Sequence, residues 1–364
     1  MNNNIIGLIF GGQSAEHDIS IMSAGFVRKA LLQNNFEIIL IVIDKEGYWR
    51  LVDNESFDGI SNGHIKLSDM RKIIPIPQGK GEFLVFEGAN SNKLFKIKID
   101  IAFPVLHGPM GEDGVVQGLL KILGIPFVGA DVLGSSIGMD KVIMKKVLRD
   151  SNIPVGNFLY FNKPQKSDIN YNEINDVLKT PFFVKPANMG SSVGISMVDN
   201  ESQLSSALDA AFNYDNKIII EEFINGRELE CSVLGDDIIA EASLPGEIKL
   251  VNNKFYSYDE KYNDSSTTII EIPAKLNKDL SEEIQNLAIK TFKVLNCYGM
   301  GRVDFFLTKE NKLIVNEINT IPGFTKISMY PKLWEASGIG SAELIRRLVD
   351  LAIIRFDKEK LLNI

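Results

Sequence analysis

The sequence predicts a mixed α/β and α+β protein that folds into two or three domains. Its 364 residues are 45% apolar and 24% charged, which is close to the globular average and provides enough chain for several hydrophobic cores. The chain opens with an apolar run, an amphipathic stretch and a second apolar run, the pattern of a βαβ unit. From residue 228 onward it is rich in strand-like segments. These three observations favour a layered α/β start followed by α+β units.

Composition and charge argue against several classes of protein. The 39 Lys and Arg against 47 Asp and Glu leave a net charge of −8, which disfavours non-specific nucleic-acid binding. Cys231 and Cys297 stand in unrelated contexts and predict neither a disulfide framework nor a metal cluster. No apolar stretch reaches the roughly 18–20 residues of a membrane helix, and the N-terminus lacks the basic region of a signal peptide. We therefore expect a cytoplasmic protein without membrane or nucleic-acid partners.

The first 130 residues predict a parallel α/β layer. Strands are expected at 5–10, 36–44 and 101–106, and helices at 15–33 and 115–123. The strands read as continuous apolar runs, which is typical of parallel strands buried on both faces. Residues 45–100 are weaker, with polar turns and a possible hairpin. The helix at 115–123 stops at Gly124, and the first domain is expected to close near Gly129.

The rest of the chain predicts a small α+β unit and then a strand-rich unit. Helices are expected at 139–149, 201–212, 280–295 and 340–356, and strands at 158–161, 181–185, 194–198 and 217–223. A long polar loop lies at 251–268. The last strands, within 300–317, flank a polar turn and predict an antiparallel hairpin.

This late hairpin gathers polar side chains that suit a divalent metal. If its turn centres on residues 310–311, Asp304 faces Glu317. Arg302 then faces Asn319, and because side chains alternate along a strand, all four lie on one face. Opposed carboxylates repel one another unless a cation neutralises them, and carboxylate and amide oxygens are ligands of Mg²⁺. A solvated polar face is the alternative, which the strongly apolar flanks disfavour.

A glycine-rich loop after a predicted strand is a candidate phosphate site. Lys185 ends the strand, and small residues occupy most of 186–194. The backbone N–H groups of such a loop can bind phosphates, and the lysine adds a point charge. Lys141, at the start of an otherwise apolar helix, is a second candidate. The loop is not a P-loop because it lacks Gly-Lys-Ser/Thr, and a plain turn with a surface lysine is the alternative.

Two further junctions follow buried strands of the first domain. The stretch at 10–18 lacks the G-x-G-x-x-G spacing, so dinucleotide binding is disfavoured. Its Glu16 is explained by a helix dipole alone unless it also binds a cationic group. The stretch from His107 to Gly118 contains four glycines, a histidine and two acids. Ligands of open α/β sheets bind at the carboxyl ends of strands, and the glycines favour close backbone approach.

Taken together, these segments resemble the D-alanine–D-alanine ligases of the ATP-grasp superfamily. The resemblance runs in order from Ile6 to about Pro331, and its most specific parts are residues 107–118 and 301–325. It implies a three-domain ATP-grasp fold with an N-terminal Rossmann-like (pre-ATP-grasp) α/β domain. The implied domains are an N-terminal one at 1–130 that binds the first D-alanine, a central subdomain at 131–223 with the glycine-rich loop, and a C-terminal subdomain at 224–364 with an ω-loop and the metal-binding hairpin.

The resemblance implies an enzyme that joins two D-alanines with ATP. ATP phosphorylates the carboxylate of the first D-alanine, and the amine of the second attacks the D-alanyl phosphate. D-alanyl-D-alanine, ADP and phosphate result, and the dipeptide serves peptidoglycan synthesis, hence cell wall biogenesis and cell shape, in the bacterial cytoplasm. A homodimer is expected. The alternatives are a D-alanine–D-serine ligase of the vancomycin-resistance type and a non-catalytic ATP-grasp homologue that only binds nucleotide.

The resemblance also implies roles for the hairpin. Asp304, Glu317 and Asn319 would hold two Mg²⁺ (or Mn²⁺) ions, with Glu317 bridging them. Arg302 would stabilise the tetrahedral oxyanion that forms when the amine attacks. Phosphoryl transfer spreads negative charge over the transferring group, so a cluster of cations at this position fits the chemistry.

The substrate set implied by the resemblance comes from distant parts of the chain. Glu16 would pair with the ammonium of the first D-alanine, and Ser191 and Tyr262 would complete a triad with it. Ser328 would bind the carboxylate of the second D-alanine. His107 belongs to the first family signature and is included as a catalytic residue.

The ATP set combines lysines with a hinge segment. Lys141 and Lys185 match the family's phosphate lysines, and Lys261 of the ω-loop at 255–262 would reach the γ-phosphate. That loop carries several aromatic residues, as a lid that excludes water would. Glu221 and Glu228 match the family's acidic positions beside the ribose, and Glu222, Phe223 and Ile224 would line the adenine slot.

The identity of the second substrate rests on a few positions. The D-lactate type of relative lacks the Lys261-Tyr262 pair of the ω-loop. The D-serine type keeps that pair but tends to carry arginine after the equivalent of Ser328, where this chain has Met329. An apolar contact suits a methyl group and discriminates by only about 1–3 kcal/mol. We therefore expect D-alanine, with D-serine as the alternative. Ser257 stands where the family more often has aspartate.

Overall fold

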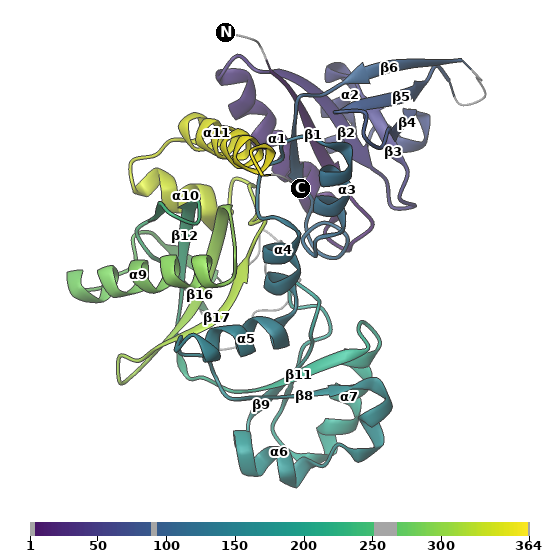
Figure 1. Ribbon diagram of the computed structural model, residues 1–364. Coiled ribbons are helices and arrows are strands. Elements are labelled where there is room, and N and C mark those ends of the chain that lie inside the picture. The colour runs from purple at the N-terminus through teal and green to yellow at the C-terminus, as the bar shows by residue number, and fades with distance from the viewer. Residues whose placement is uncertain (1–3, 89–92, 251–267, 363–364) are drawn as a thin grey trace.

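The computed structural model describes residues 4–88, 93–250 and 268–362. In these residues the strands form three sheets, with the first sheet at the top of Figure 1, the second at the bottom and the third between them. Both α/β and α+β units are present, as the sequence predicts. No helix of the described residues is long and apolar enough to cross a membrane.

The first sheet contains the predicted βαβ unit. Its strand order is β6-β5-β4-β3-β2-β1-β7, and β1 (Ile5–Gly11) pairs in parallel with both β2 (Glu37–Ile43) and β7 (Ile101–Val105). The helices α1 (His17–Gln33) and α3 (Val115–Leu123) lie where the sequence predicts them. The parallel strands are almost fully buried, which explains their unbroken apolar sequence.

Residues 45–100 add antiparallel strands that the sequence pattern only hinted at. They form β3 (Trp49–Val52), α2 (Asn54–Ser61), η1 (Leu67–Asp69), β4 (Arg71–Pro75), β5 (Glu82–Phe86) and β6 (Leu94–Lys98). The possible hairpin is the antiparallel pair β5 and β6. These strands are short and about half exposed, and β6 forms the edge of the sheet, so they lack the strong apolar signal of a buried strand.

Two helices lead out of the first unit where the sequence predicted one. The helix α4 (Val132–Met139) ends and α5 (Lys141–Asp150) begins at Asp140. The Asp140 carboxylate accepts hydrogen bonds from the N–H groups of Val142 and Ile143, both at 3.1 Å. This is an N-cap, which starts a new helix and changes the chain direction. Lys141 therefore stands in the first turn of a capped helix.

The second sheet is the predicted small α+β unit. Its antiparallel order is β10-β9-β11-β8, and two helices cover one face around Phe182 and Val184. The elements are β8 (Phe158–Asn162), η2 (Lys163–Asp168), α6 (Tyr171–Leu178), β9 (Phe182–Pro186), β10 (Ser196–Val198), η3 (Glu201–Gln203), α7 (Leu204–Phe212) and β11 (Lys217–Glu222).

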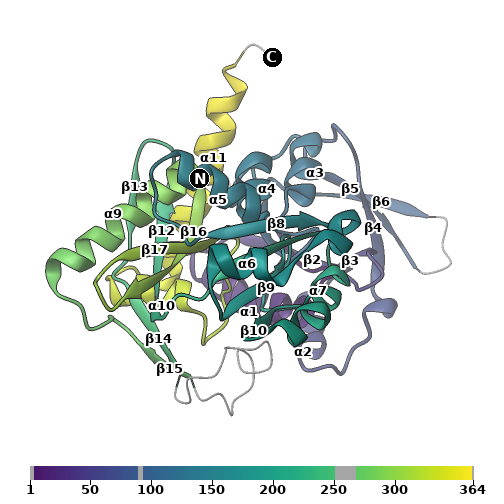
Figure 2. The ribbon, with the colours of Figure 1, turned by 90° about the horizontal axis from the view of Figure 1, so that it is seen from below.

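The third sheet lies beside the second, as Figure 2 shows, with α9 across its outer face. Its order is β15-β14-β12-β16-β17, and β13 pairs with β12. The elements are β12 (Gly226–Gly235), β13 (Ala240–Ala242), β14 (Gly246–Leu250), β15 (Thr268–Glu271), α9 (Lys278–Val294), β16 (Gly299–Thr308), β17 (Leu313–Asn319) and α10 (Met329–Ala336). The sequence pattern does not predict α10.

The hairpin β16–β17 has the predicted pairing at the end that matters and a different register near its turn. Arg302 pairs with Asn319 and Asp304 with Glu317, as predicted. Nearer the turn, the register is shifted by one residue. A β-bulge at Asn316 absorbs this shift, so that Asn316 and Glu317 both avoid the buried face. The bulge accounts for Asn316, which regular alternation would have buried among apolar residues.

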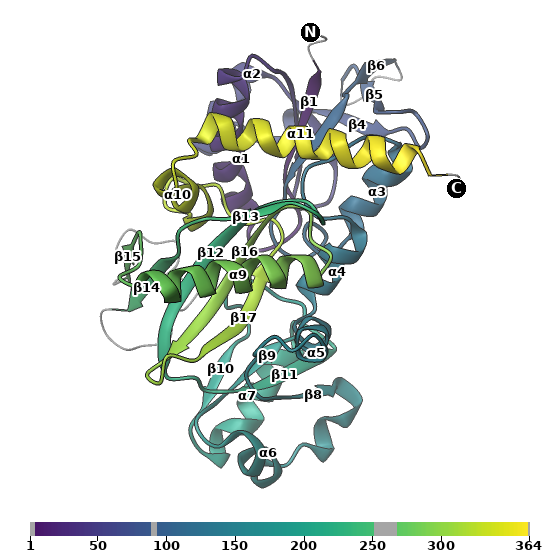
Figure 3. The same cartoon turned by 60° about the vertical axis from the view of Figure 1, so that its left-hand side comes forward.

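The C-terminal helix α11 (Ser341–Lys360) returns to the first sheet. Figure 3 shows it lying across α1. Its Leu344 and Leu348 belong to the same buried core as Leu8 of β1. The guanidinium of Arg355 donates to the carbonyls of Phe127 and Gly129 at 2.8 and 2.6 Å. The helix itself was predicted; its packing against the first sheet was not.

Candidate active site

A cleft of about 450 Å³ lies where the three sheets approach one another. It is lined from the first unit by the start of α1 and the loop after β7, from the second by the glycine-rich loop, and from the third by β12, β16, β17 and the loop before α10. Nine of the predicted site residues line it: Glu16, His107, Ser191, Glu228, Arg302, Asp304, Glu317, Asn319 and Ser328. Tyr262 and Lys261 lie outside the described residues.

The polar face of the hairpin is held together by ion pairs. Arg302 donates from Nε and Nη2 to the two carboxylate oxygens of Asp304, at 2.8 and 2.7 Å. The amide of Asn319 donates to Asp304 Oδ2 at 3.1 Å. Lys141, at the start of α5, approaches Glu317 Oε2 to 3.4 Å. Both opposed carboxylates therefore lie next to a cationic side chain of the protein.

This face fits a hard divalent cation whose shell is completed by other ligands. Two carboxylates and one amide oxygen are the donors that Mg²⁺ prefers. Within residues 4–88, 93–250 and 268–362, no cluster of three or more His, Cys, Asp or Glu side chains is arranged to hold a metal by itself. Asp304, Glu317 and Asn319 offer only two carboxylates and one amide. They would therefore need water or phosphate oxygens as further ligands, as is usual for Mg²⁺ at nucleotide sites.

Arg302 is the buried cation at the centre of this face. Burial opposes its charge, but Asp304 and Glu230 outweigh that effect and hold the pKa of Arg302 well above its usual value. Glu230 Oε2 lies 2.8 Å from Arg302 Nε. Glu230 was missed by the sequence analysis. Its strand β12 pairs with β16 so that Glu230 faces Asp304, a pairing of distant strands that local patterns do not reveal.

A second cluster of charges lies beside the glycine-rich loop. The Glu221 carboxylate lies between Lys185 Nζ at 2.7 Å and Lys145 Nζ at 2.8 Å. Burial would raise the pKa of Glu221, but the two lysines lower it far below its usual value. Burial likewise opposes the charge of Lys185, yet Glu221 raises its pKa. The cluster carries one net positive charge. Lys145 was not predicted, although it stands one turn after Lys141 in an apolar helix.

The segment predicted to line the adenine and ribose links β11 to β12. Glu222 accepts hydrogen bonds from the N–H and the side-chain amide of Asn157, at 2.7 and 3.1 Å. Phe223 is 44% exposed and its ring lies 6.1 Å from that of Phe183, centroid to centroid. Ile224 is half buried. These residues border the second sheet, while Glu228, the last of the predicted set, reaches the cleft.

The glycine-rich loop connects the second sheet to the first unit. Ser191 Oγ donates a hydrogen bond to the Glu16 carboxylate, and Lys141 Nζ donates to the Met189 carbonyl at 2.7 Å. Ser191 and Ser192 have positive φ angles of 51° and 60°, a backbone conformation that is uncommon for non-glycine residues. Two residues that the sequence placed 175 positions apart are thus brought into contact.

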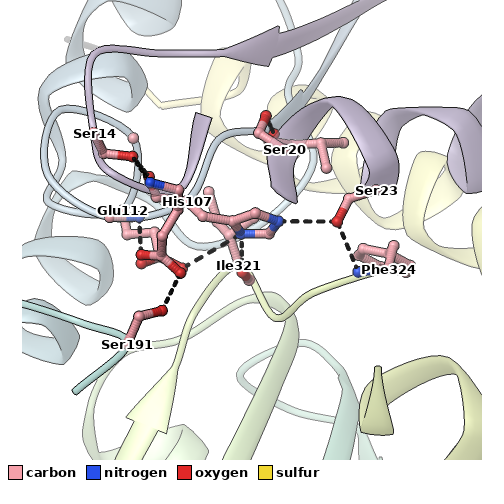
Figure 4. Close-up of polar contacts among 12 residues, drawn as sticks. Ser14, Ser20, Ser23, His107, Glu112, Ser191, Ile321 and Phe324 are labelled. Atoms are coloured by element: carbon pink, nitrogen blue, oxygen red, sulfur yellow. Dashed lines mark hydrogen bonds and ion pairs between the residues drawn. The ribbon is translucent and has the colours of Figure 1, made fainter. Parts of the chain in front are cut away.

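His107 connects the first unit to the loop before α10, as Figure 4 shows. Its Nδ1 lies 3.1 Å from the carbonyl oxygen of Ile321, and its Nε2 lies 3.1 Å from Ser23 Oγ. A carbonyl only accepts, so Nδ1 carries the proton and Nε2 accepts from the serine. Ser23 Oγ in turn accepts from the N–H of Phe324 at 3.2 Å. Burial lowers the pKa of His107, which favours this neutral form.

Glu112 is an acid of the same signature that sequence analysis left without a role. Its Oε2 accepts from the N–H of Gly108 at 2.9 Å, and its Oε1 lies 4.0 Å from His107 Nδ1. Burial, and then the nearby charge of Glu16, raise the pKa of Glu112 well above its usual value. Burial therefore shifts both Glu112 and His107 toward their neutral forms.

Ser328 stands at the start of α10 and faces the cleft. Its Oγ accepts from the N–H of Thr325 at 2.9 Å and lies 2.8 Å from Thr325 Oγ1. These contacts hold the hydroxyl in place without using all of its bonding capacity. The network of His107 thus fixes the same loop that carries Ser328.

Replacing His107 by alanine should destabilise the protein. The carbonyl of Ile321 would lose its buried donor, which costs about 1–3 kcal/mol. Chemical denaturation should show a lower midpoint with an unchanged slope. His64→Ala removes an exposed histidine and should leave the midpoint unchanged. Equal midpoints for the His107 variant and the wild type would show that this network does not hold the loop.

Comparison with known proteins gives one consistent result. The family model of the D-ala D-ala ligase N-terminus matches residues 5–130. The family model of the D-ala D-ala ligase C-terminus matches residues 147–350. The D-alanine–D-alanine ligase of Oceanobacillus iheyensis is 45% identical over 362 residues, covering 98% of this chain and 97% of the relative. D-alanine–D-alanine ligase A of Escherichia coli K12 is 43% identical over 352 residues and 96% of each chain.

Solved structures agree with the sequence comparisons. The D-alanine-D-alanine ligase from Coxiella burnetii has a TM-score of 0.84 at 36% identity, covering 99% of this chain and 97% of its own. The VanG D-Ala:D-Ser ligase from Enterococcus faecalis has a TM-score of 0.85 at 35% identity, covering 96% of this chain and all of its own. Both likenesses extend over all three sheets.

Proposed function

This chain belongs to the D-alanine–D-alanine ligase family, and we propose that the cleft between its three sheets is where two D-alanines and ATP meet. The chain is an ATP-dependent ligase with the ATP-grasp fold, and it forms D-alanyl-D-alanine. The observation that carries the site assignment is the contact of Ser191 with Glu16 next to the polar face of the hairpin. It brings one loop from each of the first two units to the face that suits a metal.

The phosphate end of the reaction is assigned to the lysines and the hairpin. Lys141 and Lys185 bind the phosphates, because Lys141 lies beside Glu317 of the hairpin and Lys185 stands on β9 just before the glycine-rich loop. Asp304, Glu317 and Asn319 would hold two Mg²⁺ (or Mn²⁺) ions, whose charge would stabilise the transferring phosphoryl group. Lys261 completes the set at the γ-phosphate.

The nucleoside is assigned to the segment between β11 and β12. Glu222, Phe223 and Ile224 line the adenine slot, and Glu228 accepts from the ribose hydroxyls. Glu221 is at an acidic position of this segment, yet both of its oxygens are next to lysines. We therefore propose that Glu221 acts at the phosphate side, where it holds Lys185 in place.

The amino-acid end is assigned to residues of all three units. Glu16, which accepts a hydrogen bond from Ser191, binds the ammonium of the first D-alanine, and Tyr262 is assigned to the same triad. Ser328 binds the carboxylate of the second D-alanine. His107 has both ring nitrogens engaged within the protein, so we assign it to holding the loop that carries Ser328 rather than to proton transfer.

The reaction has two steps. A carboxylate oxygen of the first D-alanine takes the γ-phosphoryl group of ATP, and ADP leaves. The amine of the second D-alanine then attacks the carbonyl carbon of the acyl phosphate. Arg302, which is charged and buried in the cleft, stabilises the oxyanion of the tetrahedral intermediate. The intermediate collapses with loss of phosphate and a proton from the amine, and an amide bond results.

The division of the chain is also a proposal. We place the domain boundaries at 130 and 223, because the first sheet precedes the first boundary and the second sheet lies between the two. We further propose that the protein is a homodimer of the bacterial cytoplasm with no membrane or nucleic-acid partner. The net charge of −8 is consistent with the absence of a nucleic-acid partner.

D-serine remains the alternative second substrate, since a D-Ala:D-Ser ligase is among the similar structures. Met329 follows Ser328, is buried and lines the cleft. An apolar side chain there favours a methyl group by about 1–3 kcal/mol.

Met329→Arg should therefore shift the products toward D-alanyl-D-serine by roughly 10-fold or more. Mass spectrometry of products from an equal mixture of D-alanine and D-serine measures this ratio. Met197→Arg, at an exposed position of β10, serves as the matched control. An unaltered ratio in the Met329 variant would remove this residue as a determinant of specificity.

One assay tests the whole proposal. Phosphate release from ATP should require D-alanine and Mg²⁺, and mass spectrometry should identify D-alanyl-D-alanine as the product. Stabilisation by ATP without turnover would instead indicate a homologue that only binds nucleotide.

A further inference from the structure

Glu230 is a buried carboxylate of the cleft with no role in the assignments above. It is 6% exposed and lies on β12, directly opposite Asp304 of β16. Its Oε2 lies 2.8 Å from Arg302 Nε. The same Nε donates to Asp304 Oδ1 at 2.8 Å. One guanidinium group is therefore positioned between two carboxylates that belong to neighbouring strands.

Glu230 and Asp304 have different roles in the reaction proposed above. In the proposed reaction Asp304 binds a metal ion. Its oxygens then accept hydrogen bonds from Arg302 less well, and the positive charge of the metal repels the nearby guanidinium. Glu317, the other carboxylate of the face, is next to Lys141. A buried guanidinium that loses its anion is strongly destabilised, because nothing then offsets its desolvation. Glu230 is the carboxylate already in place to prevent that loss.

We propose that Glu230 is a positioning residue that keeps Arg302 oriented in the cleft when Asp304 binds the metal. This inference rests on the proposed function, in which Asp304 holds a metal and Arg302 stabilises the oxyanion. With Glu230 beside Nε, the terminal nitrogens of Arg302 stay available to the carbonyl oxygen under attack. Glu230 also makes metal binding easier, because Asp304 can leave Arg302 without stranding it.

Glu230→Gln tests this role, since it keeps the size of the side chain and removes the charge. The turnover number should fall by about 10–100-fold, as for other residues that orient a catalytic group, while the KM for ATP changes little. Binding of Mn²⁺ to the substrate-free protein, measured by electron paramagnetic resonance, should weaken by about 10-fold. Glu230→Asp keeps the charge and should restore part of both values.

The matched control is Glu247→Gln. Glu247 is also buried in this sheet and pairs with an arginine, Arg227, at 2.9 and 2.7 Å, but it does not line the cleft. This variant should bind Mn²⁺ and turn over like the wild type. If replacing a buried glutamate by glutamine simply destabilises the protein, Glu230→Gln and Glu247→Gln should show the same decrease in melting temperature. Thermal denaturation of both variants measures this decrease.

An Arg302→Met background separates action through Arg302 from simple charge attraction. If Glu230 acts through Arg302, Glu230→Gln should change Mn²⁺ affinity in the wild type and not in this background. The same loss in both backgrounds would overturn the inference, and so would wild-type turnover and Mn²⁺ affinity in Glu230→Gln. A wild-type protein that neither binds Mn²⁺ nor releases phosphate with D-alanine would instead overturn the proposed function.

Discussion

Asp304→Ala should reduce D-alanine-dependent phosphate release by about 10³-fold or more, even at saturating Mg²⁺. A metal ion stabilises the transferring phosphoryl group by several kcal/mol, and each 1.36 kcal/mol corresponds to a factor of ten in rate. The substitution removes a ligand of that ion. It also removes the carboxylate that accepts two hydrogen bonds from Arg302. Phosphate release measured against Mg²⁺ concentration gives the size of the loss.

A second variant separates the loss of the metal ligand from the loss of side-chain packing. Asp304→Asn keeps the shape of the side chain and should lose nearly as much activity, because a neutral amide is a weaker ligand than a carboxylate. Asp350→Asn changes a half-exposed carboxylate on α11 that pairs with Arg346; it is the matched control and should be fully active. Full activity of Asp304→Ala at high Mg²⁺ would refute the assignment of the hairpin as the metal site.

Arg302→Met is the substitution with the second largest expected effect. Loss of one preorganised group that stabilises an oxyanion costs roughly 10²–10³-fold in turnover. The KM for ATP should change much less, because the phosphates are assigned to Lys141 and Lys185. Steady-state kinetics in both ATP and D-alanine separate the two parameters.

The control for Arg302 is another arginine of the same sheet. Arg227 also forks a glutamate, Glu247, away from the cleft. Arg227→Met should keep its turnover number within about 2-fold, in line with a partly exposed ion pair. A similar loss of activity in both variants would mean that Arg302 supports the sheet and not the reaction.

The structure confirms most of the elements that the sequence predicts, and the exceptions have physical causes. Strands β1, β2 and β7 are buried on both faces and therefore have an unbroken apolar pattern. The strands β4 and β6 are largely exposed, so their side chains need not be apolar. The helix α10 was missed although five of its eight residues are buried. Its contacts are with β12, which precedes it by about 100 residues.

The hairpin shows how far local pattern can reach. The pairing of Asp304 with Glu317 follows from alternation over a short loop, and it is correct. Between Asp304 and the turn, the register of the two strands differs by one residue from the predicted one. The bulge at Asn316 absorbs this difference. Alternation predicts which side chains share a face but not where an extra residue is accommodated, because a bulge depends on packing against neighbouring strands.

By itself the sequence determined the order of the elements, the family resemblance and the polar face of the hairpin, because these depend on residues close together in the chain or on whole motifs. Only the tertiary structure decided that Glu230 faces Asp304, that Lys145 shares Glu221 with Lys185, and that α11 packs on the first sheet. Those contacts join segments far apart in sequence. They arise because the sheets must bury their apolar faces together, and that packing selects which charged groups meet.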